Sequence, residues 1–252
     1  MSESKFKLLP ALATWWRQER AEASTLTVLN TLVMLTWEFV RDSLPEQRRQ
    51  RYGDIDYDWE HRVDTTGATV RWRTRLLGLL NSPYQPVPPE QFREMMTALA
   101  ARLDPNSDFS QFTFIDIGSG KGRALLLATE YGFRRIIGIE LLPELDRIAR
   151  ENVRAFKQRG GNAEMELVCG DATAFRFPAE PIVLFLFNPL PEPALRMFLQ
   201  NLENSLRHNP RRLWMIYANP VFEKEKIVAG SPLLAKAGGT HQYSLFRSSQ
   251  ET

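Results

Sequence analysis

Residues 114–123 read Phe-Ile-Asp-Ile-Gly-Ser-Gly-Lys-Gly-Arg, an apolar run that passes into three alternating glycines. Helix-like residues follow at once over 124–128. A glycine loop between a strand and a helix lets the backbone pass close beneath a ligand, where a Cβ would collide. The following helix offers N–H groups and its positive dipole end, which suit a carboxylate or a phosphate. The stretch therefore predicts a ligand-binding α/β domain.

Strand-like and helix-like runs alternate on both sides of this loop, which is typical of a parallel sheet covered by helices. The predicted strands are residues 112–117, 135–140, 165–169, 182–187 and 213–218. The predicted helices are residues 92–103, 124–128, 145–156 and 193–206. The tail from 233 to 246, with Gly238-Gly239 in its middle, predicts a closing antiparallel hairpin. We expect a doubly wound, mostly parallel seven-stranded sheet, with the apolar strand 182–187 at its centre.

The chain changes character near residues 81–89, where prolines are frequent. We expect an N-terminal helical extension over residues 1–80, serving as a lid or a dimer surface. The ligand-binding domain would then occupy residues 81–252. The apolar run 26–40 predicts a buried helix, because it is shorter and more polar than the about 20 residues that span a bilayer.

Composition excludes several classes of protein. Hydrophobic residues make up 43% of the chain and charged residues 25%, as in a globular protein. A net charge of +2 disfavours a protein whose main task is to bind nucleic acid. The single cysteine and three scattered histidines predict neither a disulfide nor a metal site. The N-terminus lacks the pattern of a signal peptide, so we expect a cytoplasmic protein.

The glycine loop itself separates two classes of cofactor. A dinucleotide fingerprint needs a small residue where Arg123 stands. The loop here is G-x-G-x-G, with Asp116 two residues before the first glycine. It resembles the first signature of the class I S-adenosylmethionine-dependent methyltransferases. The resemblance implies a Rossmann-like methyltransferase that uses S-adenosyl-L-methionine and no metal.

The same resemblance implies a set of cofactor-binding residues. Asp116 and the loop, with Gly118, Ser119 and Gly120, would hold the methionine end. Glu140 would accept hydrogen bonds from the ribose hydroxyls, since a carboxylate has two acceptor oxygens. The remaining cofactor contacts implied are Asp171 and Ala172 near the adenine, Asn188 after the next strand, and Tyr84, a lid suggested by a likeness to seven-strand protein lysine methyltransferases.

The stretch Phe187-Asn-Pro-Leu-Pro191 resembles the D/N-P-P-Y/F signature of amino-group methyltransferases. In that signature the Asn side chain and a backbone carbonyl hold the nucleophile, so Asn188 and Pro189 are the predicted catalytic residues. Leu190 departs from the signature, and no aromatic residue follows. The alternative is an ordinary strand-ending Asn-Pro turn, of which Asn219-Pro220 is a second example.

Acidic and aromatic residues crowd into residues 52–67 together with one histidine. They could hold a cationic substrate, with His61 and Asp64 in contact with it. The alternative is an ordered loop that ties the N-terminal helices to the core. We expect Lys121 and Arg123 to point to solvent or to pair with acids.

Catalysis would be a direct displacement in which the protein supplies position and desolvation. The first choice of methyl acceptor is a protein lysine or another amine. A small-molecule nitrogen or oxygen nucleophile comes second, and RNA third. The other readings left open are a non-catalytic S-adenosylmethionine-binding module and a dinucleotide oxidoreductase.

Overall fold

The computed structural model describes residues 55–66 and 85–249, together with Ser24, Val33 and Trp37. The chain divides into two compact units, and the larger one, residues 56–65 and 86–252, contains nearly all of the described residues. Residues 56–65 thus pack with the core although they were assigned to the extension. The boundary between the two predicted domains stays a prediction.

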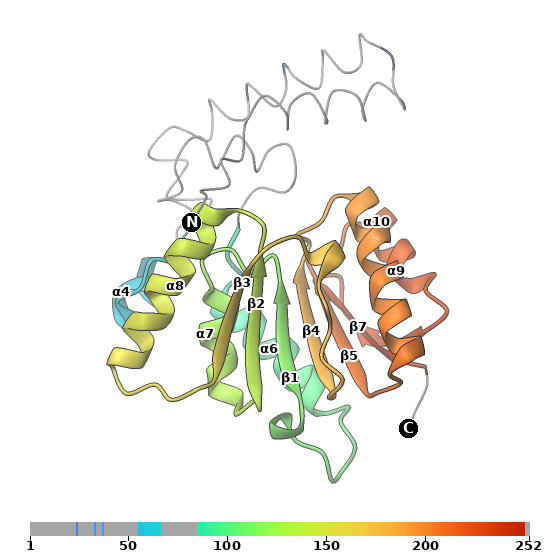
Figure 1. Cartoon of the computed structure of the whole chain (residues 1–252), viewed down its shortest axis with the longest axis horizontal. Coiled ribbons are helices and arrows are strands. Elements are labelled where there is room, and N and C mark those ends of the chain that lie inside the picture. The colour runs from blue at the N-terminus through green and yellow to red at the C-terminus, as the bar shows by residue number, and fades with distance from the viewer. Residues whose placement is uncertain (1–23, 25–32, 34–36, 38–54, 67–84, 250–252) are drawn as a thin grey trace. The chain divides into compact units, whose positions relative to one another are not determined.

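Seven strands form one mixed sheet (Figure 1). They are β1 (Thr113–Ile117), β2 (Arg135–Glu140), β3 (Met165–Cys169), β4 (Ile182–Phe187), β5 (Leu213–Ala218), β6 (Leu234–Gly239) and β7 (Tyr243–Ser248). Their order is β3-β2-β1-β4-β5-β7-β6, with the first five parallel and β7 antiparallel to both of its neighbours. The predicted mostly parallel sheet and the central place of β4 are confirmed.

Six α-helices lie in the described part of the chain. They are α4 (Ile55–His61), α6 (Pro89–Ala100), α7 (Arg123–Ala128), α8 (Pro143–Gln158), α9 (Glu192–His208) and α10 (Phe222–Ala229). Of these, α4 and α10 were not predicted. Both are short, and the sequence of α10 has no marked apolar face, so periodicity could not find them.

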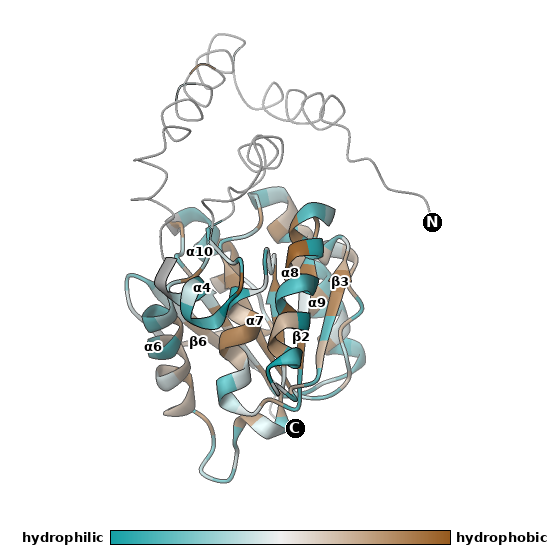
Figure 2. Ribbon diagram, turned by 90° about the vertical axis from the view of Figure 1, so that its left-hand side faces the viewer, coloured by the Kyte–Doolittle hydropathy of each residue, from teal (hydrophilic) through white to brown (hydrophobic). Residues whose placement is uncertain are grey.

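Each face of the sheet buries its own apolar cluster, because successive strand residues point to opposite faces. In β1, Phe114 belongs to the cluster shared with α6 and α7, whereas Ile115 and Ile117 belong to the cluster shared with α9 and α10. Helix α7 lies between α6 and α8 in contact with both, and all of its side chains are buried. Figure 2 accordingly shows α7 mostly in the colour of apolar residues. The doubly wound architecture is confirmed.

The predicted hairpin is present, but its glycines are not at the turn. Gly238 and Gly239 close strand β6, and the turn itself spans residues 240–242. A Cβ at Gly238 would lie 2.7 Å from the guanidinium of Arg102, and one at Gly239 would lie 2.4 Å from the carbonyl oxygen of Tyr243. These glycines permit close approach to neighbouring groups, which a sequence cannot distinguish from turn formation.

The parallel strands bring several loops to one edge of the sheet. Gly118, Glu140, Gly170 and Asn188 follow or end β1, β2, β3 and β4, whose carboxyl ends lie side by side. Open α/β sheets bind their ligands at this edge.

Two further findings concern the sequence expectations. Within the described residues, no helix combines the length and apolar character needed to cross a membrane. In the run 26–40 only Val33 and Trp37 are described; both are helical, with 67% and 62% of their surface exposed, so the predicted burial is wrong for these two.

Candidate functional site

The glycine loop is fixed by its own N–H groups. Those of Gly118 and Ser119 both donate to the carbonyl oxygen of Ile139 on β2, at 2.8 and 3.0 Å. The N–H of Gly120 donates to Oε2 of Glu140 at 2.8 Å. Because three successive N–H groups are bonded inside the protein, the loop does not offer them to a phosphate. The anion site expected from the sequence used the N–H groups of the following helix, and that expectation stays a prediction.

Two buried carboxylates lie beneath the loop. Asp116, on β1, is 4% exposed, and no described residue donates a hydrogen bond to it. Burial raises its pKa well above the usual range, and the charge of Glu140 raises it further. Burial also raises the pKa of Glu140, while hydrogen bonds from backbone N–H groups, foremost that of Leu142, oppose the shift.

This arrangement fits the cationic end of a ligand better than an anionic one. A buried carboxylate without a donor costs free energy until a partner arrives. An ammonium group would supply both a positive charge and hydrogen-bond donors to Asp116. Glu140 accepts the N–H groups of Gly120 and Leu142 at 2.8 Å, one at each oxygen, and the N–H of Leu141 also lowers its pKa. A carboxylate has about four acceptor positions, so it keeps capacity for a hydroxyl.

Ser119 has a different orientation from the one its assignment suggested. Its hydroxyl is buried, has no hydrogen-bond partner, and lies against Gly138 of β2. A Cβ at Gly138 would stand 2.9 Å from that hydroxyl oxygen and 2.6 Å from Cδ1 of Leu125. Gly138 therefore lets the loop and α7 lie close to the strand. We did not predict this role, and the only sequence signal was a glycine inside an otherwise apolar strand.

The turn after β4 touches the glycine loop directly. A Cβ added to Gly118 would lie 2.4 Å from Cβ of Pro189. Gly118 also has a φ of +74°, in the left-handed region that favours glycine. The loop and the Asn188–Pro189 turn, which the sequence placed after different strands, are thus in contact.

The side chain of Asn188 is held by two donors. Its Oδ1 accepts from the hydroxyl of Tyr217 on β5 at 3.2 Å and from Nζ of Lys224 on α10 at 3.0 Å. Both lone pairs of that oxygen are therefore used inside the protein. Lys224 was missed because α10 was not predicted.

The second Asn-Pro turn provides a comparison within the chain. Asn188 and Asn219 both have a left-handed backbone, with φ of 46° and 50°. Asparagine tolerates this conformation better than most residues, so the backbone alone does not mark a functional residue. What distinguishes Asn188 is its side-chain contacts and the packing of Pro189 on the loop.

The residues expected near the adenine lie at the same edge. Asp171 is exposed, and its carboxylate accepts from the N–H of Thr173 at 2.8 Å, which caps a short 3-10 helix. Ala172 is buried. Tyr84 lies outside the described residues.

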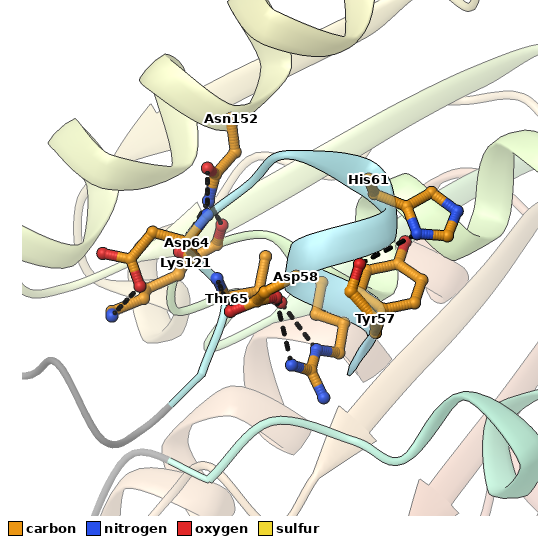
Figure 3. Close-up of polar contacts among 8 residues, drawn as sticks. Tyr57, Asp58, His61, Asp64, Thr65, Lys121 and Asn152 are labelled. Carbon is orange, nitrogen blue, oxygen red and sulfur yellow. Dashed lines mark hydrogen bonds and ion pairs between the residues drawn. The ribbon is translucent and has the colours of Figure 1, made fainter. Parts of the chain in front are cut away.

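Residues 58–65, here called the strap, bind the far end of the glycine loop (Figure 3). The carboxylate of Asp58 pairs with the guanidinium of Arg123 at 3.2 Å, and both side chains are buried. Thr65 accepts from Nε of Arg123 at 2.7 Å and donates its backbone N–H to Asp58 at 2.8 Å. The Arg123 guanidinium also lies 5.1 Å from the ring centre of Tyr57.

A second set of contacts joins the strap to Lys121. The fully buried ammonium of Lys121 pairs with the carboxylate of Asp64 at 2.7 Å. Asn152 of α8 donates to the backbone oxygens of Asp64 and Lys121, at 2.8 and 2.9 Å, and accepts the N–H of Asp64 at 2.9 Å. The expectation that Lys121 and Arg123 point to solvent is wrong, whereas the alternative, that they pair with acids, is confirmed.

His61 is also part of a local structure. Its ring stacks on Tyr57 with centroids 4.2 Å apart, and its Nδ1 lies 2.9 Å from the Tyr57 carbonyl oxygen. These contacts of His61 and Asp64 support an ordered segment bound to the core, and their role in substrate binding stays a prediction.

A groove of about 440 Å³ runs along α9 and α10, apart from the residues described above. Its lining includes the charged residues Glu192, Arg196, Glu203, Glu223 and Lys226. These form pairs within their own helices, as in Glu192 with Arg196 at 2.8 Å and Glu223 with Lys226 at 3.5 Å. The groove therefore looks like an ordinary charged surface.

Comparison with known proteins gives one family match. Residues 114–209, which include the loop, Glu140, Asp171 and the Asn188 turn, match a family described as a methyltransferase domain. No curated protein matches the chain.

Solved structures resemble the fold at low identity. A ribosomal protein L11 methylase from Lactobacillus delbrueckii subsp. bulgaricus is 14% identical, covering 67% of this chain and 81% of its own, with a TM-score of 0.46. An S-adenosylmethionine-dependent methyltransferase from Aquifex aeolicus is 15% identical, covering 65% and 98%, with a TM-score of 0.44. An RNA methyltransferase from Salinibacter ruber, in complex with S-adenosyl-L-homocysteine, is 19% identical, covering 65% and 92%, with a TM-score of 0.41. Likenesses this distant say nothing about the methyl acceptor of this chain.

Proposed function

We propose that the glycine-loop edge binds S-adenosylmethionine and that the Asn188–Pro189 turn receives the methyl acceptor. The match of residues 114–209 to a methyltransferase domain supports this. The cofactor supplies a methyl group made electrophilic by a sulfonium. The protein supplies binding, orientation and a path for the proton that the acceptor loses.

The observation that carries the proposal is the buried carboxylate of Asp116, to which no described residue donates, beneath a loop in which the N–H groups of Gly118, Ser119 and Gly120 are already bonded. Asp116 would bind the ammonium of the cofactor's methionine end, beside the backbone of Gly118 and Gly120. Glu140 would bind the ribose hydroxyls through its remaining lone pairs. A pyrophosphate, by contrast, would meet two buried carboxylates and three loop N–H groups, those of Gly118, Ser119 and Gly120, that are already bonded, which disfavours a dinucleotide.

The remaining cofactor contacts are assigned by position. Asp171 and Ala172 would lie near the adenine, because they follow β3 at the carboxyl edge. Ser119 would contribute through its backbone, since its hydroxyl faces Gly138. Tyr84 keeps its proposed role as a lid.

For the acceptor, we retain an amine, a protein lysine included, as the first choice and a small-molecule nitrogen or oxygen nucleophile as the second. The support is the Asn-Pro turn and its contact with the glycine loop. Because both lone pairs of Asn188 Oδ1 are taken, an acceptor would displace a donor from this oxygen or contact the donors themselves.

Titration calorimetry tests the cofactor site. S-adenosylmethionine and S-adenosylhomocysteine should bind to the full chain, and NAD should not. Asp116→Asn should weaken both sulfur nucleotides, whereas Glu151→Gln, which changes an exposed acid of α8, should weaken neither. Binding of NAD alone, or unchanged binding in Asp116→Asn, would refute the proposed site. Glu140→Ala is a poorer test, because Glu140 also holds the loop through the N–H of Gly120.

A further inference from the structure

Lys224 is a half-buried lysine held by uncharged groups. Its Nζ donates to Oδ1 of Asn188 at 3.0 Å, and that oxygen also accepts from Tyr217. Within residues 55–66 and 85–249, no carboxylate lies within ion-pairing distance of Nζ. Lysines are rarely withdrawn from water without an anion, so this placement needs an explanation.

The surroundings of Lys224 lower the affinity of its amine for a proton. Burial lowers the pKa of Lys224, and the more distant charge of Glu192 at the start of α9 opposes this only in part. Burial raises the pKa of Tyr217 to about 12, so this neighbour stays neutral near pH 7.

The other charged groups of α10 are already paired. Glu223 pairs with Lys226 on the same helix at 3.5 Å. Glu225 pairs with Lys236 of β6 at 2.7 Å and accepts from the hydroxyl of Ser244 on β7.

We propose that Lys224 accepts the proton that the methyl acceptor loses, with Asn188 holding its Nζ beside the position of methyl transfer. This inference rests on the proposed function. The acceptor's lone pair forms the new bond to the methyl carbon, and the methyl–sulfur bond breaks with its electron pair kept by sulfur. The acceptor's proton passes to the uncharged Nζ, which becomes an ammonium. Asn188 touches the proton acceptor, so it is a positioning residue.

The proposal narrows the class of acceptor. A lysine that can receive a proton is useful to a nucleophile that carries one, which means a hydroxyl or a primary or secondary amine. A thioether or a tertiary amine has no proton to transfer. The proposal also explains why Oδ1 of Asn188 accepts a hydrogen bond from Lys224 instead of remaining available to the substrate.

The test needs no knowledge of the acceptor. S-adenosylmethionine carries a sulfonium charge that S-adenosylhomocysteine lacks, while the two share the groups that Asp116 and Glu140 would bind. We therefore use the dissociation constant of S-adenosylmethionine divided by that of S-adenosylhomocysteine. This ratio reports the electrostatic environment of the sulfur. A protonated Lys224 at this place should repel the sulfonium and raise the ratio by about three- to tenfold.

Calorimetry at increasing pH, up to the usual pKa of a lysine, should give a ratio that falls as pH rises in the unmodified chain. Lys224→Arg keeps its charge throughout, so its ratio should stay high and flat. Lys224→Gln keeps a donor for Asn188 without a charge, so its ratio should stay low and flat. Lys226→Gln removes an exposed charge from the same helix and should behave like the unmodified chain.

Three outcomes would overturn the proposal. One is a flat ratio in the unmodified chain, and another is a pH-dependent ratio that persists in Lys224→Gln. The third is methylation of Lys224 itself, detected by mass spectrometry after incubation with S-adenosylmethionine, since Lys224 would then be a nucleophile. If neither nucleotide binds at all, the proposed function fails instead.

Discussion

The two sides of the glycine loop are built in opposite ways. On the strap side, Arg123 and Lys121 are buried cations, and each has a carboxylate within 3.2 Å. On the open edge, Asp116 is a buried carboxylate with no donor among the described residues. The same short loop therefore separates a set of charges satisfied within the protein from one that is not.

The difference separates structure from function. Buried polar groups with partners hold a fold in one arrangement, whereas a buried carboxylate without a donor is a candidate for contact with a ligand. Both sides contain buried charged groups, so charge and burial alone do not distinguish a structural role from a ligand-binding role. The completeness of the hydrogen bonding indicates that the strap supports the loop, and it supports the proposal that the edge binds the cofactor.

The largest effect is expected from Asp58→Ala, which leaves Arg123 buried without its carboxylate. Breaking a buried pair in this way costs about 3–5 kcal/mol. Urea denaturation should show this loss in the free energy of unfolding. The double variant Asp58→Leu, Arg123→Met should recover most of it; if it is as unstable as the single variant, the ion pair is not the cause.

Gly118→Ala tests the contact between the loop and the Asn-Pro turn. The substitution combines a left-handed backbone with a clash against Pro189, and should lower the free energy of unfolding by about 2–3 kcal/mol. Gly132→Ala is the matched control, since its φ of +69° is similar and nothing lies within 4 Å of the added Cβ. Equal losses in the two variants would mean that the contact with Pro189 costs nothing.

Asp116→Asn should weaken cofactor binding while it stabilises the free protein. Loss of a charged hydrogen bond to the cofactor should reduce affinity for S-adenosylhomocysteine by about 10- to 100-fold. The free protein should become more stable near neutral pH, because a buried charge without a partner is removed. Thermal unfolding with and without the nucleotide checks both expectations, and a destabilised free protein would contradict the second.

The pH dependence of this effect has a definite sign. The pKa of Asp116 is raised in the folded state, so the folded protein holds more protons than the unfolded one between the two pKa values. Stability of the free protein should therefore fall as pH rises from the unfolded pKa through the folded one. Asp116→Asn should lack this part of the slope, and urea titrations at several pH values would measure it.

The smallest effect is expected from Asp64→Asn on the strap. Its carboxylate is 44% exposed, so solvent weakens its pairing with Lys121, and the backbone bonds to Asn152 remain. The loss in the free energy of unfolding should be about 1 kcal/mol. A loss as large as that of Asp58→Ala would show that solvent does not weaken the Asp64–Lys121 pair relative to the Asp58–Arg123 pair.

Much of the fold could be predicted from apolar periodicity. Four of the strand predictions, 135–140, 165–169, 182–187 and 213–218, agree with the structure at both ends. The predicted methyltransferase agrees with the family match over residues 114–209, because a glycine loop in a fixed strand-helix context is specific. The cofactor stays a proposal.

The side-chain contacts that form the candidate site could not be predicted from the sequence. The pairing of Asp58 with Arg123 and of Asp64 with Lys121 joins residues more than fifty positions apart, and nothing in either segment shows its partner. Lys224 lies on a helix without an apolar face, so periodicity gave no reason to place it beside Asn188. The use of the loop's N–H groups inside the protein is likewise a property of the folded backbone.

Calorimetry of S-adenosylhomocysteine binding at several pH values from 4.5 to 7, repeated in buffers of different ionisation enthalpy, tests the cofactor role of Asp116 most directly. Over this range the ligand's amino group is already protonated, so it does not supply a proton released on binding. If the ammonium pairs with Asp116, the pKa of that carboxyl falls, and the unmodified chain should release protons that Asp116→Asn does not. Equal proton release in the two proteins, or none in either, would contradict the assignment of Asp116 to the cofactor's cationic end.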